Sequence, residues 1–191
     1  CRRKEGRNMS EEAVIKHCSP TLAGIKTGNL FSCGCPSRAA LKQDIRNLNR
    51  VLNPKGIRVL LMRTSEKRGL VYFYRPQRLS QDLAATEAKE ILQSRGYSCR
   101  STEACLKELV KKYREAEEFP HEIGLFLSYP CTDVKGFIEH RDSNCKCIGC
   151  WKVYGDDHSA EKQFAQYKRC TEIYKKRWSQ GASLQQLAVS S

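Results

Sequence analysis

Two dense apolar segments, residues 57–62 and 70–74, constrain the fold of this chain more than any other feature. Large aliphatic and aromatic side chains dominate both, and the polar segment between them contains Gly69. Runs of this length and composition predict two strands, and their short separation favours an antiparallel hairpin. Because neither run alternates regularly with polar residues, we expect both faces of the hairpin to be buried. We therefore expect helices from the rest of the chain to cover both faces of this hairpin.

Helical periodicity is clearest over residues 37–52, where Leu41, Ile45 and Leu48 recur on one face and Ser37 can cap the N-terminus. Further helices are expected at residues 10–16, 79–95, 101–113 and 132–138, and the longest follows Tyr154. The inner face of that last helix is predicted to carry Phe164, Tyr167, Thr171, Tyr174 and Trp178, and its outer face Lys162, Lys168, Arg169, Lys175, Lys176 and Arg177.

The remaining apolar runs, residues 123–129 and 147–154, predict two more strands, whereas residues 21–36 are expected to form a glycine-rich loop. About four strands and about six helices make an α/β or α+β protein. We expect its sheet to be mixed, and its 191 residues fit one domain. We predict a single domain over residues 9–191 and a basic, disordered leader over residues 1–8.

Composition narrows the class of protein. No apolar run approaches the roughly 20 residues that a membrane span requires, and no signal peptide is visible, so we expect a cytoplasmic protein without membrane contact. The eleven cysteines are then expected to be free thiols. The net charge of +13 permits nucleic-acid binding, but no DNA- or RNA-binding motif accompanies it.

Two histidines stand where chemistry could occur. His17 lies beside Cys18 at a predicted helix-to-loop break, where side chains are presented to solvent. A structural interpretation, a turn histidine beside a buried thiol, stays open. His121 and Glu122 enter a predicted strand, whose alternation points the two side chains to opposite faces. Only one of them could then share a pocket with the neighbouring strands.

Other side chains suggest a metal or an anion as ligand. Cys145, Cys147 and Cys150 include one Cys-x-x-Cys pair, which is suggestive of zinc or an iron-sulfur cluster but lacks the second pair that such sites usually have. We therefore predict no metal site and keep these three cysteines as an alternative. Lys26, Arg75 and Lys152 could recognise an anion, although most such side chains are simply solvated. No nucleotide-binding loop is present.

Three blocks of sequence together resemble a known family. They are HCSPTLAGIK at residues 17–26 with Asn29, Leu30 and Phe31; FPHEIGLFL at 119–127 continuing to DVKGFI at 133–138; and WKVYG at 151–155. They are similar to an uncharacterised bacterial family, domain of unknown function 3793, found mainly in anaerobic Gram-positive organisms. The resemblance covers nearly the whole chain from Met9. It implies no activity or cofactor, but it draws attention to His17, Thr21, Lys26, His121 and Glu122.

We therefore weigh three functions. The first is a small-molecule enzyme whose site joins the His17–Lys26 loop to the Pro120–Gly124 strand. In it His17, His121 or Glu122 would carry the catalysis and Thr21, Lys26, Asp133 and Lys152 would bind an anionic substrate. The second is a non-enzymatic protein that binds a metal, a redox cofactor or a partner. The third, least favoured, is nucleic-acid binding.

Overall fold

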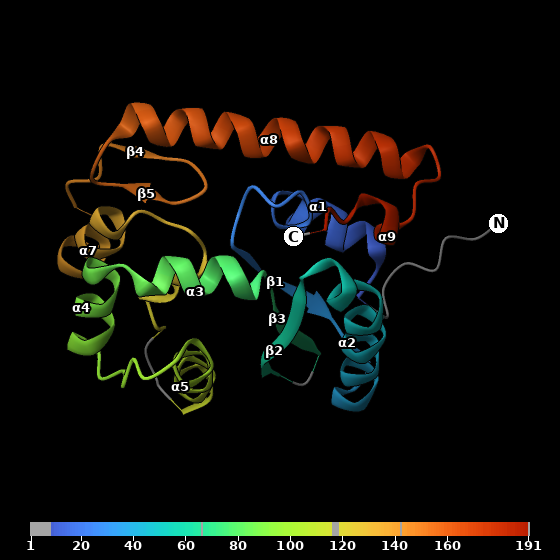
Figure 1. Ribbon diagram of the computed structural model, residues 1–191, viewed down its shortest axis with the longest axis horizontal. Helices are drawn as coiled ribbons and strands as arrows, with labels where there is room; N and C mark the ends of the chain where they lie inside the picture. Colours follow the sequence, from blue (N-terminus) through green and yellow to red (C-terminus); the bar gives the residue numbers. More distant parts are fainter. Residues whose placement is uncertain (1–8, 66, 116–118, 142, 191) are drawn as a thin grey trace. The chain divides into compact units, whose positions relative to one another are not determined.

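The predicted hairpin lies in the first of the two units into which the chain divides (Figure 1). The computed structural model describes residues 9–65, 67–115, 119–141 and 143–190. Unit 1 runs to Arg75 and resumes with Cys170–Ser191, and unit 2 is Pro76–Arg169. The predicted leader, residues 1–8, lies outside the described residues, and the single domain over 9–191 remains a prediction.

A three-stranded sheet forms the centre of unit 1. β2 (Arg58–Thr64) and β3 (Arg68–Tyr74) make the hairpin, and β1 (Gly28–Gly34) pairs with the other edge of β3. The mixed α and β class is confirmed, but both pairings are antiparallel, so the expectation of a mixed sheet is wrong. A hairpin with one added edge strand needs no parallel pair, and an antiparallel sheet satisfies its backbone equally well.

β1 falls inside the segment that the sequence predicts to be a loop. Its glycines at positions 28 and 34 are the two ends of the strand, while Phe31 and Cys33 between them are buried in the core of unit 1. Glycines that bound a strand look like loop residues when only composition is read. Hydrogen bonding to β3 stabilises these residues as a strand, which the local sequence does not indicate.

Helices cover this sheet as the hairpin requires. They are α1 (Glu11–Leu22), α2 (Arg38–Leu52), the 3-10 turn η1 (Asn53–Lys55) and α9 (Leu184–Leu187). The Ser37 hydroxyl accepts a hydrogen bond from Ala40 N–H, so the predicted cap of α2 is confirmed. α1 and α9 lie side by side (Figure 1), and Leu22, Leu41 and Leu187 are buried in one core with the sheet.

The sequence predicts that α1 ends at Lys16, ahead of Pro20, but the helix continues to Leu22. The sequence ends this helix before Pro20 because a proline removes a backbone donor and restricts the residue before it. The structure satisfies the last turn from outside the helix instead: Pro20 C=O accepts Ile25 N–H at 3.0 Å, and the Arg75 guanidinium donates to Thr21 C=O at 2.7 Å. Tertiary hydrogen bonds thus outweigh the local proline signal.

Unit 2 is mostly helical. It contains α3 (Pro76–Ala84), α4 (Thr86–Ser94), α5 (Thr102–Glu115), α6 (Ile123–Phe126) and α7 (Cys131–His140), then a small hairpin of β4 (Cys147–Ile148) and β5 (Lys152–Val153). The one helix predicted over residues 79–95 is two, because the extended backbone of Ala85 separates α3 from α4.

Two predicted strands of unit 2 are wrong. Residues 123–126 form the short helix α6, all four buried, because a short apolar run cannot distinguish a buried strand from a buried helix. Residues 147–154 bend into the β4–β5 hairpin around Gly149 and Cys150. A Cβ on Gly149 would lie 2.2 Å from the Phe164 ring, so the bend needs a glycine for close approach.

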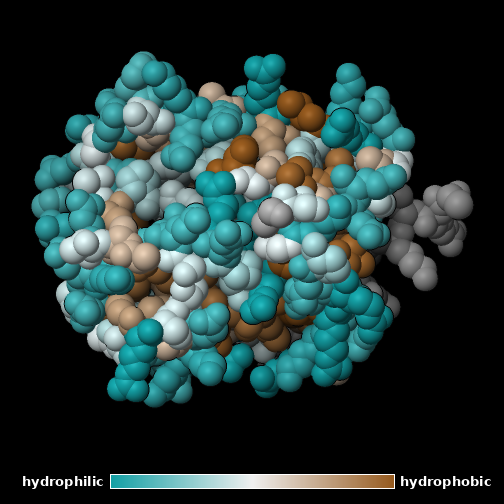
Figure 2. Space-filling view, viewed as in Figure 1, coloured by the Kyte–Doolittle hydropathy of each residue, from teal (hydrophilic) through white to brown (hydrophobic). Residues whose placement is uncertain are grey.

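The longest helix, α8 (Asp157–Ser179), begins in unit 2 and ends in unit 1. Its predicted faces are confirmed: Tyr167 and Tyr174 are buried, whereas its six lysines and arginines are exposed. Hydrophilic side chains stand out along α8 at the top of the view in Figure 2. Within the described part of the chain, no helix combines the length and apolar character that crossing a membrane requires.

Candidate functional site

An aromatic pocket in unit 2 gathers three of the predicted site residues. His121, Asp133 and Lys152 line a cavity of about 350 Å³ between the segment before α6, the helix α7 and the strand β5. Its remaining walls are mainly aromatic and aliphatic: Phe119, Ile123, Gly124, Tyr129, Val134, Phe137 and Trp151. Pockets with apolar walls and a few polar groups are the usual form of small-molecule sites.

Ring contacts fix the walls of this aromatic pocket. The Tyr129 and Trp151 rings are stacked with centroids 4.7 Å apart. The His121 imidazole packs edge-on against Phe137 at 4.9 Å and lies 5.6 Å from Phe119. Such offset and edge-to-face pairs are favourable beyond the area that they bury. The histidine is therefore held within a frame of aromatic rings.

Lys152 is the cation of the aromatic pocket. Its ammonium group lies 5.5 Å from the centroid of the Phe137 ring, within the range of a cation–π interaction. β5 positions it, since Lys152 pairs with Ile148 of β4 while the adjacent Trp151 is buried in the pocket wall. A half-buried ammonium beside aromatic faces suits a ligand that combines a flat apolar body with a negative charge.

Asp133 organises the pocket wall through its carboxylate. One oxygen accepts the Trp151 indole N–H at 2.7 Å, and the other accepts the backbone N–H groups of Tyr154 and Gly155, each at 2.8 Å. The residue is 3 % exposed, and these three donors satisfy its buried carboxyl oxygens. Asp133 thus holds Trp151 in place, a positioning role different from the predicted contact with substrate.

Glu122 faces away from the aromatic pocket into a buried polar cluster. It is 1 % exposed, accepts the Tyr97 hydroxyl at 2.9 Å, and lies 3.6 Å from Nε of Arg95. Burial and the Glu122 carboxylate hold the pKa of Tyr97 well above its ordinary value, so the phenol keeps its proton as donor. Sequence reasoning expected His121 and Glu122 to diverge, and they do, although from a turn rather than a strand.

The remaining predicted residues, His17, Thr21 and Lys26, belong to unit 1. His17 is exposed on α1 and stacks on Phe31 at 5.1 Å, and burial followed by the charges of Lys16 and Lys175 lowers its pKa. Thr21 is buried in the last turn of α1 and donates to Asn29 at 2.7 Å. The expectation that these residues meet His121 in one site remains a prediction.

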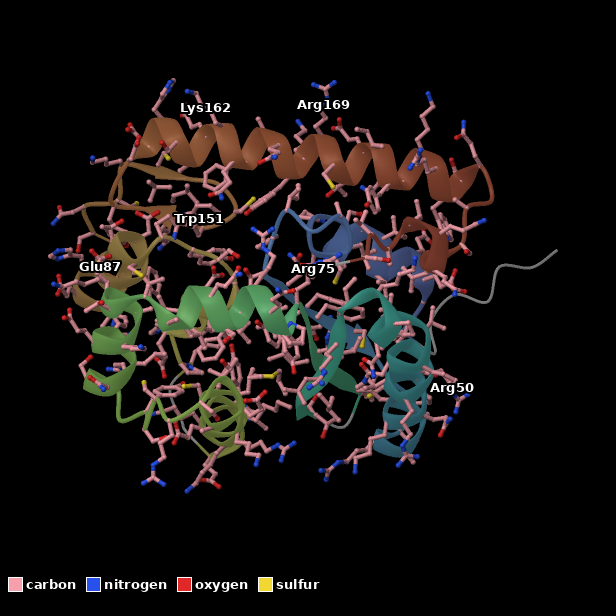
Figure 3. All side chains as sticks on the ribbon, in the orientation of Figure 1. Arg50, Arg75, Glu87, Trp151, Lys162 and Arg169 are labelled. Atoms are coloured by element: carbon pink, nitrogen blue, oxygen red, sulfur yellow. The ribbon has the colours of Figure 1, made fainter. Side chains whose placement is uncertain are left out.

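Two cationic residues of unit 1 that the sequence analysis named, Lys26 and Arg75, are buried. Lys26 is 5 % exposed, and its charge partly offsets the effect of burial, which raises the pKa of the Cys18 thiol well above its ordinary value. A thiolate at Cys18 is therefore disfavoured. Arg75, a possible anion binder, instead donates to the backbone carbonyls of Thr21, Leu22, Lys55 and Val189 at 2.7 to 3.4 Å. Its side chain is labelled in Figure 3.

The cysteines from Cys18 to Cys170 are free thiols. Cys145 and Cys147 are half-buried, and Cys150 is exposed. Across the described ranges, no group of three histidine, cysteine or acidic side chains is arranged to hold a metal ion.

Sequence reasoning missed the aromatic lining of the pocket. Phe119, Phe137 and Trp151 all stand in the blocks that carry the family resemblance, yet aromatic residues in predicted strands and helices are normally assigned to the core. Phe119 gave one signal in the sequence, since it is a single phenylalanine between a polar segment and Pro120. In the structure its side chain is 49 % exposed.

The comparisons with known proteins concern the chain as a whole. No curated protein and no solved structure matches it significantly. The model of one family, described as protein of unknown function (DUF3793), matches residues 14–188. This match runs from within α1 to just beyond α9 and includes every residue of the aromatic pocket. The chain therefore belongs to the DUF3793 family of proteins of unknown function.

Proposed function

We propose that this chain is a small-molecule enzyme whose substrate is a flat, largely apolar molecule carrying a carboxylate or phosphate group. The observation that carries the proposal is the combination, in one pocket of about 350 Å³, of aromatic walls with one imidazole and one ammonium group. Aromatic faces favour a planar ring system, and a lysine beside them favours a negative charge on it.

His121 and Lys152 have separate tasks in this proposal. Lys152 binds the anionic group and fixes the orientation of the substrate. His121 transfers the proton, because imidazole is the side chain that gains and loses a proton most readily near neutral pH. Asp133 keeps Trp151 in the wall against which the ring system packs. The proposed compartment is the cytoplasm, in which eleven cysteines stay reduced most easily.

Binding can be measured through Trp151, which lines the pocket. The chain has two tryptophans, so Trp178→Phe leaves Trp151 as the only indole signal. We expect naphthalene-2-carboxylate to quench this fluorescence at least tenfold more tightly than the neutral naphthalene-2-carboxamide. Lys152→Met, added to Trp178→Phe, should remove the preference for the carboxylate, since only the charge is lost.

Lys162→Met is the matched control, because it removes one exposed lysine of unit 2 outside the pocket. It should leave both affinities unchanged. Equal affinity of the parent protein for the acid and the amide, or equal loss in both lysine variants, would contradict the proposed anion site.

The same walls favour a second function, a protein that binds a planar cofactor or ligand without converting it. His121→Gln separates the two possibilities. If the chain is an enzyme, the affinity of this variant for the aromatic acid should stay within about threefold of the parent value. For any aromatic acid that the parent converts, the variant should have a rate at least 100-fold lower. A chain that binds such acids tightly and converts none in a panel of aromatic acids, esters and phosphates would be a binding protein.

A further inference from the structure

The net positive charge of the chain resides in one of its two units. Unit 1 contains 19 lysines and arginines against 6 aspartates and glutamates, whereas unit 2 contains 15 of each class. Unit 1 therefore accounts for the whole formal net charge of +13. A charge asymmetry of this kind within one chain suggests that the basic part binds a polyanion.

The helix α2 presents four of these cations on its exposed side. Arg38, Lys42, Arg46 and Arg50 recur every four residues, and all four are exposed. A step of four residues rises about 6 Å and turns about 40° around the helix axis, so the four side chains form one basic ridge about 18 Å long. Arg50 projects outward from α2 in Figure 3.

No acidic side chain interrupts the basic ridge. Asp44 is the only acid of α2, and one of its carboxyl oxygens is buried. Among the residues that the structure describes, no carboxylate lies within ion-pair distance of a ridge residue. The exposed side of α5 in unit 2 differs, because there Lys111 faces Glu115 at 3.8 Å. The positive charge of the ridge is thus available to a partner.

Contacts on the other side of α2 hold the basic ridge toward solvent. Leu41, Ile45 and Leu52 are buried in the core of unit 1. The Asn49 amide donates to Val59 C=O at 2.9 Å and accepts Val59 N–H at 2.8 Å, which joins α2 to the strand β2. The ridge is therefore carried on a fixed support, which lowers the entropy cost of binding.

The form of the basic ridge matches the phosphate backbone of a DNA duplex. Three of its four residues are arginines, whose guanidinium groups bind phosphate oxygens in bidentate pairs. The major groove of B-form DNA is about 12 Å wide and admits an α-helix, which is about 10 to 12 Å across. The major groove of an RNA duplex is too narrow for a helix.

Two other polyanions fit the surface of unit 1 less well. Single strands bind to exposed aromatic rings, but no phenylalanine, tyrosine or tryptophan in the described part of unit 1 is exposed. A helix that lies on an anionic membrane inserts apolar side chains, whereas those of α2 are mainly buried in the core.

We propose that unit 1 binds double-stranded DNA without sequence preference, with α2 against the major groove and the basic ridge on the phosphates that border it. The proposal does not depend on what binds in the aromatic pocket, which belongs to unit 2.

The test measures the fluorescence anisotropy of a labelled DNA duplex of about 24 base pairs with the full chain. Four phosphate contacts predict that the affinity falls at least about 100-fold between 50 and 200 mM salt, because binding releases counterions. At one salt concentration, duplex DNA should bind at least tenfold more tightly than the duplex RNA or the single-stranded DNA of the same sequence, or phosphatidylglycerol vesicles.

Variants assign this binding to α2, since the first eight residues of the chain are also basic. Lys42→Gln and Arg50→Gln should each weaken binding about fivefold to tenfold at 100 mM salt and reduce the slope of the salt dependence by about 1. Both positions are exposed, so the unfolding temperature should change by less than about 2 °C.

Lys107→Gln and Arg114→Gln are the matched controls, because they remove the same charges from exposed positions of α5 in unit 2. They should leave the affinity within about twofold of the parent value. Equal effects of the α2 and α5 variants would overturn the proposal. So would tighter binding of the unaltered chain to single-stranded DNA, duplex RNA or vesicles than to duplex DNA, a result that requires no variant to fold.

Discussion

At the scale of single residues, two buried carboxylates show what the sequence can and cannot indicate. Asp133 and Glu122 both stand in blocks that resemble the family, and both were predicted as site residues. Asp133 reaches the aromatic pocket and accepts three hydrogen bonds that shape its wall, whereas Glu122 is buried against Tyr97. Sequence identifies such side chains as unusual, but the direction of each one depends on tertiary packing.

The predicted lysine and histidine of the same pocket, Lys152 and His121, could be named from sequence because charged or imidazole groups inside apolar motifs seldom serve packing alone. The aromatic partners could not be named in this way. Phe137 and Trp151 have the same chemistry whether they fill a core or line a cavity, so only the structure distinguishes the two uses.

His17 gives a prediction about pH at this scale. Its pKa in the folded chain lies below the ordinary value of 6.5, so the folded state binds the proton more weakly than the unfolded chain does. The stability that the neutral imidazole contributes is fully present above pH 6.5 and is lost as the pH falls through the lowered pKa. His17→Gln should therefore flatten the decline of the unfolding free energy between pH 7.5 and pH 5.

Urea unfolding at these two pH values measures the effect. His158→Gln, which replaces an exposed histidine at the start of α8, provides the comparison and should retain the decline. An equal decline in His17→Gln and in the parent chain would refute the assignment to His17.

At the scale of elements, the sequence predicts long amphipathic helices and the central hairpin well, and short elements poorly. α2, α5 and α8 extend over several turns, so their apolar faces recur often enough to establish a period. α6 has four residues, and β4 and β5 have two each, so no period can develop in them. Long-range contacts decide these elements, and contacts of that kind are not visible in a single sequence.

Gly124 in α6 tests how tightly one such short element packs. A Cβ at this position would lie 2.7 Å from a Val134 methyl group and 3.0 Å from the Tyr129 ring. Gly124→Ala should therefore lower the unfolding free energy by about 2 kcal/mol, as overpacking of a core does. Because Val134 and Tyr129 line the aromatic pocket, the affinity for an aromatic acid should fall as well.

The matched control is Gly34→Ala, since a Cβ at Gly34 would meet no atom within 4 Å. Its unfolding free energy should stay within about 0.5 kcal/mol of the parent value. Urea unfolding and Trp151 fluorescence provide the two measurements. If Gly124→Ala were as stable as Gly34→Ala, helix α6 would be more loosely packed than the structure indicates.

At the scale of the whole molecule, the sequence correctly predicts a chain of mixed α and β structure but does not reveal its two units. No linker of glycine, proline or serine marks the passage at Arg75, because the chain continues from β3 into α3 with a single residue between them. The chain re-enters unit 1 at Cys170, which lies within α8, and the helical pattern of the sequence continues there without interruption. Boundaries inside or beside regular elements leave no compositional signal.

Arg75 joins distant parts of unit 1 and provides the prediction at this scale. Arg75 is 2 % exposed, and its guanidinium donates to carbonyls of α1, of η1 and of Val189, which follows α9. Arg75→Met leaves these acceptors without their donor, so we expect a loss of about 3 kcal/mol in the unfolding free energy measured with urea.

Arg58→Met, at an exposed position of β2, removes an arginine without such bonds among its described contacts and should cost less than about 0.5 kcal/mol. A loss of less than about 1 kcal/mol in Arg75→Met would mean that water replaces the guanidinium without difficulty.

The contacts of Arg75 also set an order of events during synthesis. Leu184 and Leu187 of α9 are buried in the core of unit 1, and Val189 accepts a hydrogen bond from Arg75, but the ribosome makes all of unit 2 before it makes these residues. At the usual elongation rates of 5 to 20 residues per second, the N-terminal part waits about 6 to 20 s for them. During that interval the part of the unit 1 core that later packs against α9 is still without this helix.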